Sequence, residues 1–337
     1  MNQPVTKKRV AVIGLGKMGL LHASIINALP GAQVVALCES KGIVRRFARK
    51  MFGNTGIVSK VSELSDYRLD AVYVTTPPSS HFPIIKQIYS DNITGNIFIE
   101  KPLAGNHDQA EEICRITEYS KGINMVGYQK RFAVTYKKAK EILDQGEIGE
   151  AISFKSHAYS SDFYNVKKGS KQPGARGGVL RDSGCHAIDL ALWLFGELDI
   201  DSAELNSIIS ENSIDSAYIR ARTAQGLNGE FDVSWCMDNY RLPEIMLYIK
   251  GSRGEIKVNE DKVELILNNG KPSTWYRHDL NDSVPFLLGE AEYCREDDFF
   301  IEAITAGPGS ACNFYTAARV DELITRAEVK AGRAQLG

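Results

Sequence analysis

The sequence has few cysteines and no long apolar stretch. Its six cysteines are scattered over 337 residues, and none forms a C-x-x-C pair. Because structural metal sites and redox motifs need closely spaced ligands, we expect no metal site and reduced thiols, as in a cytoplasmic protein. No run reaches the ~18 apolar residues of a membrane-spanning helix. The polar, basic start also lacks the apolar core of a signal peptide, so no leader is expected.

Neither sign of charge is in excess, and repeats and low-complexity linkers are absent. The chain has 40 Lys and Arg against 42 Asp and Glu, a net charge of −2, so neither nucleic acid nor a membrane surface is expected as a partner. A chain of 337 residues exceeds one ordinary core, and its composition is that of a globular protein. We therefore expect two domains, residues 1–127 and 128–337, with the last helix free to pack back on the first.

A glycine motif near the start organises the first domain. The apolar run Val10–Ile13 leads into G-x-G-x-x-G at Gly14, Gly16 and Gly19, and a helical pattern follows. This order of strand, glycines and helix is the context of a dinucleotide-binding fingerprint, although the bare motif also occurs in ordinary turns. The first glycine permits a tight turn, the second lets the backbone approach a pyrophosphate, and the third allows close packing of the helix. Lys17 and Met18, at the start of the helix, are expected to contact the same cofactor.

An acidic residue predicts the cofactor type. Glu39 ends the second predicted strand 20 residues after Gly19, where a carboxylate can accept both ribose hydroxyl groups and repel a 2′-phosphate. This favours NAD. NADP stays possible, because Ser40 and Lys41 supply a hydroxyl and a cation beside it. A solvated charge at a strand end is the alternative interpretation of Glu39.

Further strands of the first half are expected to bring more residues to the cofactor. A buried strand ends at Thr75-Thr76-Pro77, where proline stops the pairing, and His81 begins the next helix. Ligands bind at the carboxyl ends of such parallel strands, so these residues are predicted cofactor contacts. His81 can equally be a packing residue. Alternating strands and helices up to residue 127 predict a doubly wound parallel sheet, a Rossmann fold.

The next strand, Asn96 to Ile99, runs into Glu100-Lys101-Pro102. A lysine at the carboxyl end of a strand points into the cofactor crevice. If it is desolvated or crowded by another cation, its pKa falls and it can assist proton transfer. A surface lysine in a salt bridge is the alternative.

The second half is rich in alternating strands joined by short turns. They are expected at 151–160, 203–210, 216–223, 229–236, 244–250, 254–259 and 263–268. They predict a large, mostly antiparallel sheet in an α/β domain, open on one face. A second subunit is a plausible cover for that face, so a homodimer or homotetramer is expected. Helices at 296–305 and 311–330 close the chain.

Two stretches of this half are candidates for substrate binding. The long segment 160–178 carries Lys167, Lys168, Lys171 and Arg176, close to aromatic residues such as Tyr159, and is either a binding loop for an anionic group or a solvated loop. Asp182, His186 and Asp189 have the spacing of one helix face, so carboxylates can orient the imidazole. We expect His186 and Asp182 to be catalytic and Asp189 to anchor a basic group.

Together these stretches resemble the Gfo/Idh/MocA family of nicotinamide-dependent oxidoreductases, which includes inositol and sugar dehydrogenases. The most specific features are Glu100-Lys101-Pro102 and, some 80 residues later, D-x-G-x-H-x-x-D from Asp182 to Asp189. Thr76-Pro77 with His81, and the Trp193–Gly196 helix end, agree. The resemblance covers nearly the whole chain and implies a Rossmann domain followed by an open-faced α/β domain, with the substrate between them.

The resemblance also implies residue roles. Lys101 matches the active-site lysine, Asp182 its partner acid, His186 the acid/base histidine, and Glu100 a residue near the nicotinamide ribose. Gln129 and Arg131 match the segment that approaches cofactor and substrate. The predicted substrate-binding set is Lys101, Arg131, Tyr159, Arg176, Asp182 and His186. Arg176 stands where the family often has a glycine, and Ser40-Lys41 replaces a common Asp-Pro.

The expected reaction is hydride transfer between a ring secondary alcohol of a sugar or cyclitol and NAD(P). Histidine would take the hydroxyl proton, and lysine would stabilise the developing alkoxide. Other functions stay open: redox-assisted glycoside cleavage with retained NAD, a transferase or oxidase that recycles its cofactor, and a non-catalytic sensor of sugars or dinucleotides. The sequence does not identify the substrate.

Overall fold

A computed structural model describes residues 7–163, 177–211, 213–307 and 312–332 of the chain. These residues form two compact units. Unit 1 comprises residues 1–129 and 283–318, and unit 2 comprises residues 130–282 and 319–337. The first unit is therefore built from two separate parts of the sequence.

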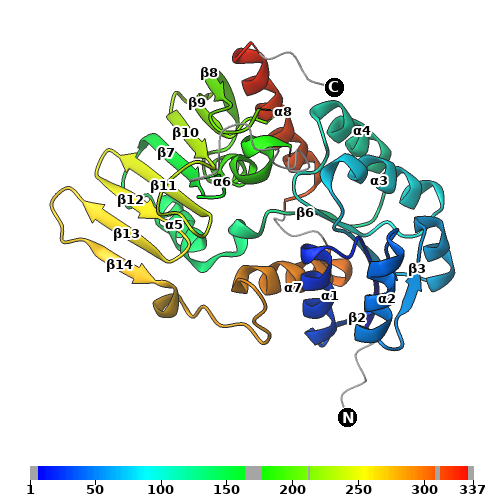
Figure 1. Cartoon of the computed structure of the whole chain (residues 1–337). Coiled ribbons are helices and arrows are strands. Elements are labelled where there is room, and N and C mark those ends of the chain that lie inside the picture. Colours follow the sequence, from blue (N-terminus) through cyan, green and yellow to red (C-terminus); the bar gives the residue numbers. More distant parts are fainter. Residues whose placement is uncertain (1–6, 164–176, 212, 308–311, 333–337) are drawn as a thin grey trace. The chain divides into compact units, whose positions relative to one another are not determined.

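Unit 1 contains a six-stranded parallel sheet in the order β3-β2-β1-β4-β5-β6 (Figure 1). The strands are β1 (Lys8–Ile13), β2 (Ala32–Cys38), β3 (Gly56–Val58), β4 (Ala71–Val74), β5 (Ile97–Glu100) and β6 (Asn124–Gly127). The central strands are apolar and almost fully buried, as expected of parallel strands covered on both faces. The strand order reverses between β1 and β4, the place where such sheets bind ligands.

Helices connect these strands and cover the sheet. They are α1 (Lys17–Ala28), α2 (Gly42–Met51), α3 (His81–Ser90) and α4 (His107–Thr117), with short 3₁₀ segments at 61–67 and 78–80. The late helix α7 (Ala291–Ala306) belongs to the same unit and contacts α1, while α3 contacts α4. A doubly wound α/β unit is thus completed by a segment from near the end of the chain.

Unit 2 contains an eight-stranded sheet in the order β14-β13-β12-β11-β7-β10-β9-β8. Its strands are β7 (Ala151–Tyr159), β8 (Leu198–Asn206), β9 (Ser216–Thr223), β10 (Asn228–Ser234), β11 (Glu244–Gly251), β12 (Gly254–Val258), β13 (Lys262–Leu267) and β14 (Ser273–Tyr276). Only β7 and β10 pair in parallel, and the other neighbours are antiparallel. The expected fold class, a parallel Rossmann sheet plus a mostly antiparallel sheet, is confirmed.

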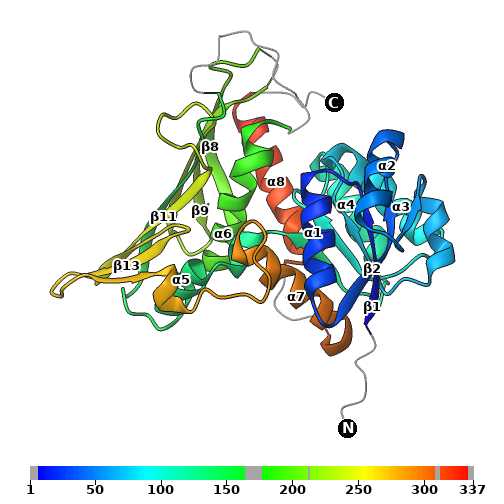
Figure 2. The same ribbon diagram turned by 60° about the horizontal axis from the view of Figure 1, so that its bottom comes forward.

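One face of this second sheet is covered by helices (Figure 2). They are α5 (Val134–Asp144), which contacts β12 and β13, and α6 (Cys185–Phe195), which contacts β7 and β11. Buried residues such as Phe154, Phe231 and Leu247 alternate along the strands with more exposed ones and form the core under the helices. The last helix, α8 (Phe314–Lys330), begins in unit 1 and ends in unit 2.

Several elements differ from the sequence prediction. Strand β8 begins at Leu198, five residues before the expected start, although its first four residues alternate between buried and exposed as in a strand. The short strand β14 was not expected at all. Helix α7 begins at Ala291 rather than at residue 296, because charged residues in its first turns hide its apolar face. Among the described residues, no helix is both long and apolar enough to cross a membrane.

Candidate functional site

The glycine motif has the geometry expected of a phosphate-binding turn. Gly14 has φ +90°, a left-handed conformation that favours glycine. A Cβ atom on Gly19 would lie 1.9 Å from the carbonyl oxygen of Gly14, so only glycine lets α1 pack this close to the turn. A Cβ atom on Gly16 would meet nothing within 4 Å. The space beside Gly16 is therefore open to a ligand.

The start of α1 is suited to an anion. Gly16 is its N-cap and provides no side-chain hydrogen bond, and the first turn contains no acidic residue. Lys17 and Met18 form the first helical positions. Because the N–H groups and the dipole at a helix start attract negative charge, this terminus fits a pyrophosphate.

Glu39 lies beside this turn and joins two loops. One carboxylate oxygen accepts the N–H of Leu15 at 3.0 Å, and the other accepts the N–H of Lys41 at 2.8 Å and the Ser40 hydroxyl at 3.3 Å. Burial alone would raise the pKa of Glu39, but these hydrogen bonds outweigh it and lower the pKa below its ordinary value. A fixed negative charge thus stands where a dinucleotide would place its adenosine ribose.

The loop after β4 closes on the glycine turn. The hydroxyl of Thr75 donates to the carbonyl oxygens of Ile13 and Gly14, at 3.0 and 2.7 Å. Thr76 and Pro77 follow it, and the Thr76 hydroxyl accepts a hydrogen bond from Ser80. Thr75 is therefore a brace for the turn, while the next two residues occupy the carboxyl end of the strand.

The side chain of His81 has a packing role, and its contact with a cofactor stays a prediction. Its side chain is fully buried, and its ring nitrogens lie 3.0 Å from the carbonyl oxygen of Pro102 and 2.7 Å from that of Thr76. Burial lowers the pKa of His81. The ring ties the loop after β4 to the loop after β5, which is the packing role that the sequence had left open.

Glu100 and Lys101 stand at the carboxyl end of β5, two strands from β1 in the same sheet. Glu100 is 8% exposed, and its carboxylate accepts the backbone N–H of Lys101 at 3.1 Å. Gln129, just beyond β6, donates a hydrogen bond to the Tyr293 hydroxyl at 3.1 Å. The predicted cofactor residues of unit 1, apart from His81, therefore lie on the strand ends and loops around one edge of its sheet.

In unit 2, Asp182 and His186 lie in one helical segment that is not a regular α-helix. Asp182 is in a π-helical turn, η5 (Leu180–Gly184), and His186 is in the first turn of α6. The expectation of one continuous α-helix face through both residues is therefore wrong, since the π turn changes their angular spacing. Ser183, between them, accepts a hydrogen bond from the Trp235 indole at 3.2 Å, which fixes the turn against the sheet.

Asp189 anchors a basic group, as the sequence indicated. The guanidinium of Arg131 donates to both of its oxygens, at 2.8 and 2.6 Å, and both side chains are buried. Arg131 is thereby held beside α6, and its direct contact with substrate stays a prediction.

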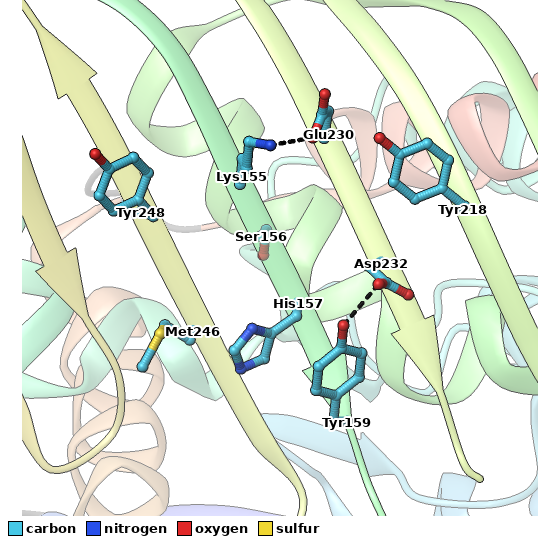
Figure 3. Close-up of a pocket in the computed structure, with 9 residues that line it drawn as sticks. All are labelled: Lys155, Ser156, His157, Tyr159, Tyr218, Glu230, Asp232, Met246 and Tyr248. Carbon is cyan, nitrogen blue, oxygen red and sulfur yellow. Dashed lines mark hydrogen bonds and ion pairs between the residues drawn. The ribbon is translucent and has the colours of Figure 1, made fainter. Parts of the chain in front are cut away.

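Tyr159 lies on the face of the unit 2 sheet that is turned away from α6, and its predicted substrate role stays a prediction. Along β7, buried Phe154 and Ala158 face the helices, whereas Lys155 and Tyr159 face the other side of the sheet. There Tyr159 donates to Asp232 at 2.6 Å and stacks on His157, in a shallow hollow of about 440 Å³ (Figure 3). The helix α6 that bears the candidate histidine packs on the opposite face.

Arg176 and the cations Lys167, Lys168 and Lys171 lie outside the described residues.

Sequence reasoning missed a buried histidine in unit 1. His22 on α1 is fully buried, and its ring lies between the carboxylates of Glu100 and Asp297. The available signal was a histidine three residues after Gly19 in an otherwise apolar helix. Its partner Asp297 is 275 residues away in the sequence and could not be found without the fold.

Two family models match the chain and agree with this architecture. Residues 8–128 match the oxidoreductase family with an NAD-binding Rossmann fold, and residues 136–257 match the GFO/IDH/MocA C-terminal domain. The chain is also similar to curated proteins. It is 24% identical over 309 residues to inositol 2-dehydrogenase of Rhizobium meliloti, which covers 89% of each chain.

A second curated relative and a solved structure are also similar to this chain. The chain is 29% identical over 213 residues to scyllo-inositol 2-dehydrogenase (NAD(+)) of Bacillus subtilis, covering 61% of this chain and 57% of that protein. The fold of this chain is similar to that of levoglucosan dehydrogenase in complex with NADH, with a TM-score of 0.87 and 21% identity over 97% of this chain and 98% of the other.

Proposed function

The chain belongs to the Gfo/Idh/MocA family of oxidoreductases with an NAD-binding Rossmann domain, and on that premise we propose that it is a dehydrogenase of sugar or cyclitol ring alcohols. It would transfer a hydride between a secondary alcohol of the ring and NAD. The inositol 2-dehydrogenases among its relatives support this substrate class. The observation that carries the proposal is the uncapped start of α1 with open space at Gly16, on the same sheet edge as Lys101.

The residues of unit 1 fit NAD. The first turn of α1 would hold the pyrophosphate, and Glu39 would accept hydrogen bonds from the adenosine ribose. NAD would supply the hydride acceptor. The Glu39 charge favours NAD over NADP, and the neighbouring groups support this preference. Ser40 is turned toward Glu39, and Arg45 donates to the backbone carbonyls of Glu39 and Ser40, at 2.7 and 2.6 Å.

The chemical step needs groups from both units. In the proposed reaction the imidazole of His186 takes the hydroxyl proton, since its ordinary pKa lies near neutrality. Lys101 hydrogen-bonds the same oxygen and stabilises the negative charge that develops on it. Asp182 orients the imidazole or binds a neighbouring hydroxyl. This role for Lys101 and His186 requires that both reach one alcohol oxygen.

A substrate panel tests this proposal. Sugars, cyclitols and nucleotide sugars are mixed with the protein and NAD or NADP, and reduced nicotinamide is followed by its absorbance. Stoichiometric, released NADH with a ring alcohol supports a dehydrogenase. Product without released NADH would favour cofactor recycling or redox-assisted cleavage. Ligand binding without any turnover would favour a sensor.

We also propose that a second copy of the chain covers the open face of the unit 2 sheet. This face carries charges of both signs, including the Lys155–Glu230 pair at 2.8 Å, with tyrosines and Met246 around a shallow hollow (Figure 3). Such a mixed, partly apolar face suits pairing with itself. Met246→Glu would place a charge at its centre, and light scattering should then show a smaller assembly than that of the wild type. An unchanged mass, or a monomeric wild type, would contradict this.

A further inference from the structure

His22 occupies a position that its sequence context does not explain. It lies on α1, in the helix that begins at the glycine motif, and its ring is fully buried. The ring lies among the aromatic rings of Tyr73, Phe98 and Tyr293, with centroid distances of 5.5, 5.1 and 6.2 Å. A polar ring in such a setting needs polar partners for both nitrogens.

Both partners are carboxylates. Nδ1 lies 2.8 and 3.0 Å from the two oxygens of Asp297, and Nε2 lies 2.9 Å from Oε1 of Glu100. A neutral imidazole donates from one nitrogen only, so its other lone pair would face a carboxylate oxygen. A doubly protonated ring donates to both.

The oxygens of both carboxyl groups have donors within hydrogen-bond distance. Both oxygens of Asp297 share the Nδ1 donor, and the second oxygen of Glu100 accepts the backbone N–H of Lys101 at 3.1 Å. Neither contact requires a carboxyl proton. Burial alone would lower the pKa of His22, but the two carboxylates outweigh it and hold the pKa well above its ordinary value. Tyr73 and Tyr293 also face the ring, and both are neutral because burial raises their pKa.

We propose that His22 is a permanently protonated positioning residue, held by Asp297, that fixes the carboxylate of Glu100 and through it the backbone of Lys101. The chain of contacts links three elements of unit 1: α7, α1 and the end of β5. Helix α7 thereby has a role in unit 1, the unit that contains the glycine motif. Asp297, which holds the ring at Nδ1, is itself fully buried.

This inference rests on the proposed function only in assigning Lys101 to the chemistry; the protonation and the positioning are measurable without turnover. In the variant Asp297→Asn, the amide can donate to Nδ1, and a neutral ring can still donate from Nε2 to Glu100. Without the Asp297 charge the pKa of the ring should fall, because burial lowers it and only Glu100 still raises it. Its bond to Glu100 then loses the positive charge on the donor, so the two groups no longer form an ion pair and the bond is weaker.

The experiment uses the full chain as wild type, Asp297→Asn and the matched control Asp298→Asn. Asp298 is the next residue of α7, and the carboxylates that contact His22 are those of Asp297 and Glu100. Nitrogen NMR of labelled histidine should show both His22 nitrogens protonated from pH 6 to 9 in the wild type and the control. In Asp297→Asn one proton should be lost within this range. Amide exchange at residues 97–103, corrected for the intrinsic rate, should become faster above pH 7 in Asp297→Asn alone.

Two results would overturn the inference. One is a wild-type His22 that carries a single ring proton at pH 7. The other is an exchange profile of Asp297→Asn that matches that of the control. Failure of the proposed function is distinguishable, because the wild type would then form no NADH with any ring alcohol while the NMR and exchange results stand.

Discussion

The guanidinium of Arg131 and the carboxylate of Asp189 form a buried bidentate pair, with N–O distances of 2.8 and 2.6 Å. The side chains are 9% and 1% exposed. The pair connects the segment that enters unit 2 with α6, the helix that carries His186. The pair thereby fixes the position of α6 relative to that segment.

Removing one partner of this pair should destabilise the protein strongly. Asp189→Asn removes the carboxylate charge from a buried ion pair, which typically costs about 3–5 kcal/mol of unfolding free energy. Chemical denaturation measures the loss. The control is Asp201→Asn, which removes the partner of Arg222 in an exposed pair and should cost less than about 1 kcal/mol. Equal losses in the two variants would show that burial does not govern this interaction.

Substitutions at two glycines should separate folding from cofactor binding. Gly19→Ala brings a Cβ atom against the Gly14 carbonyl oxygen, so it should lower the melting temperature. Gly16→Ala meets nothing in the protein and should leave the melting temperature unchanged while weakening NADH binding, because its Cβ occupies the approach of the pyrophosphate. Calorimetry and NADH fluorescence give the two readouts. Unweakened NADH binding by Gly16→Ala would place the pyrophosphate elsewhere.

The charge of Glu39 should control the choice between NAD and NADP. Glu39→Gln removes the repulsion of a 2′-phosphate, so the ratio of the two dissociation constants should move toward NADP by on the order of 100-fold, since like charges in contact cost several kcal/mol and every ~1.4 kcal/mol is tenfold. Glu63→Gln, on the loop after β3, is the matched control and should leave the ratio unchanged. If both variants keep the wild-type ratio, the adenosine ribose does not lie at Glu39.

The protonated His22 should make stability depend on pH. Its pKa is raised in the folded state, so its contribution is complete below the unfolded pKa of about 6.5 and is lost as pH rises toward the folded value. Between pH 7 and 9 this group should lower the unfolding free energy by up to about 1.4 kcal/mol per pH unit. The difference in slope between wild type and His22→Gln, from denaturation at several pH values, isolates it. Parallel slopes would contradict a raised pKa.

The sequence predicted the elements whose signals are local. The glycine turn, the position of Glu39 directly after β2 and the alternation in β7 each follow from neighbouring residues, and the structure agrees with them. The packing role of His81 could not be predicted from neighbouring residues. One partner is a backbone carbonyl of the preceding loop and the other lies 21 residues further on, and a histidine that binds a ligand has the same local pattern.

The surroundings of three other residues could not be predicted either, because they depend on the fold and not on neighbouring residues. Tyr159 looked like part of the substrate segment because it adjoins a basic stretch, but a strand turns successive side chains to opposite faces, and its register placed it on the far one. The π turn at Asp182 leaves no signature in the spacing of residues. Asp297 reaches His22 only because the fold returns α7 to the first unit.

The central claim is that Lys101 and His186 act on one alcohol oxygen beside NAD. It is tested most directly by NADH formation from the best ring alcohol of the panel, with wild type, Lys101→Ala and His186→Ala. The account predicts that each variant loses about 10²–10⁴-fold in kcat while NADH binding stays close to that of the wild type. Rates near that of the wild type in both variants would contradict it.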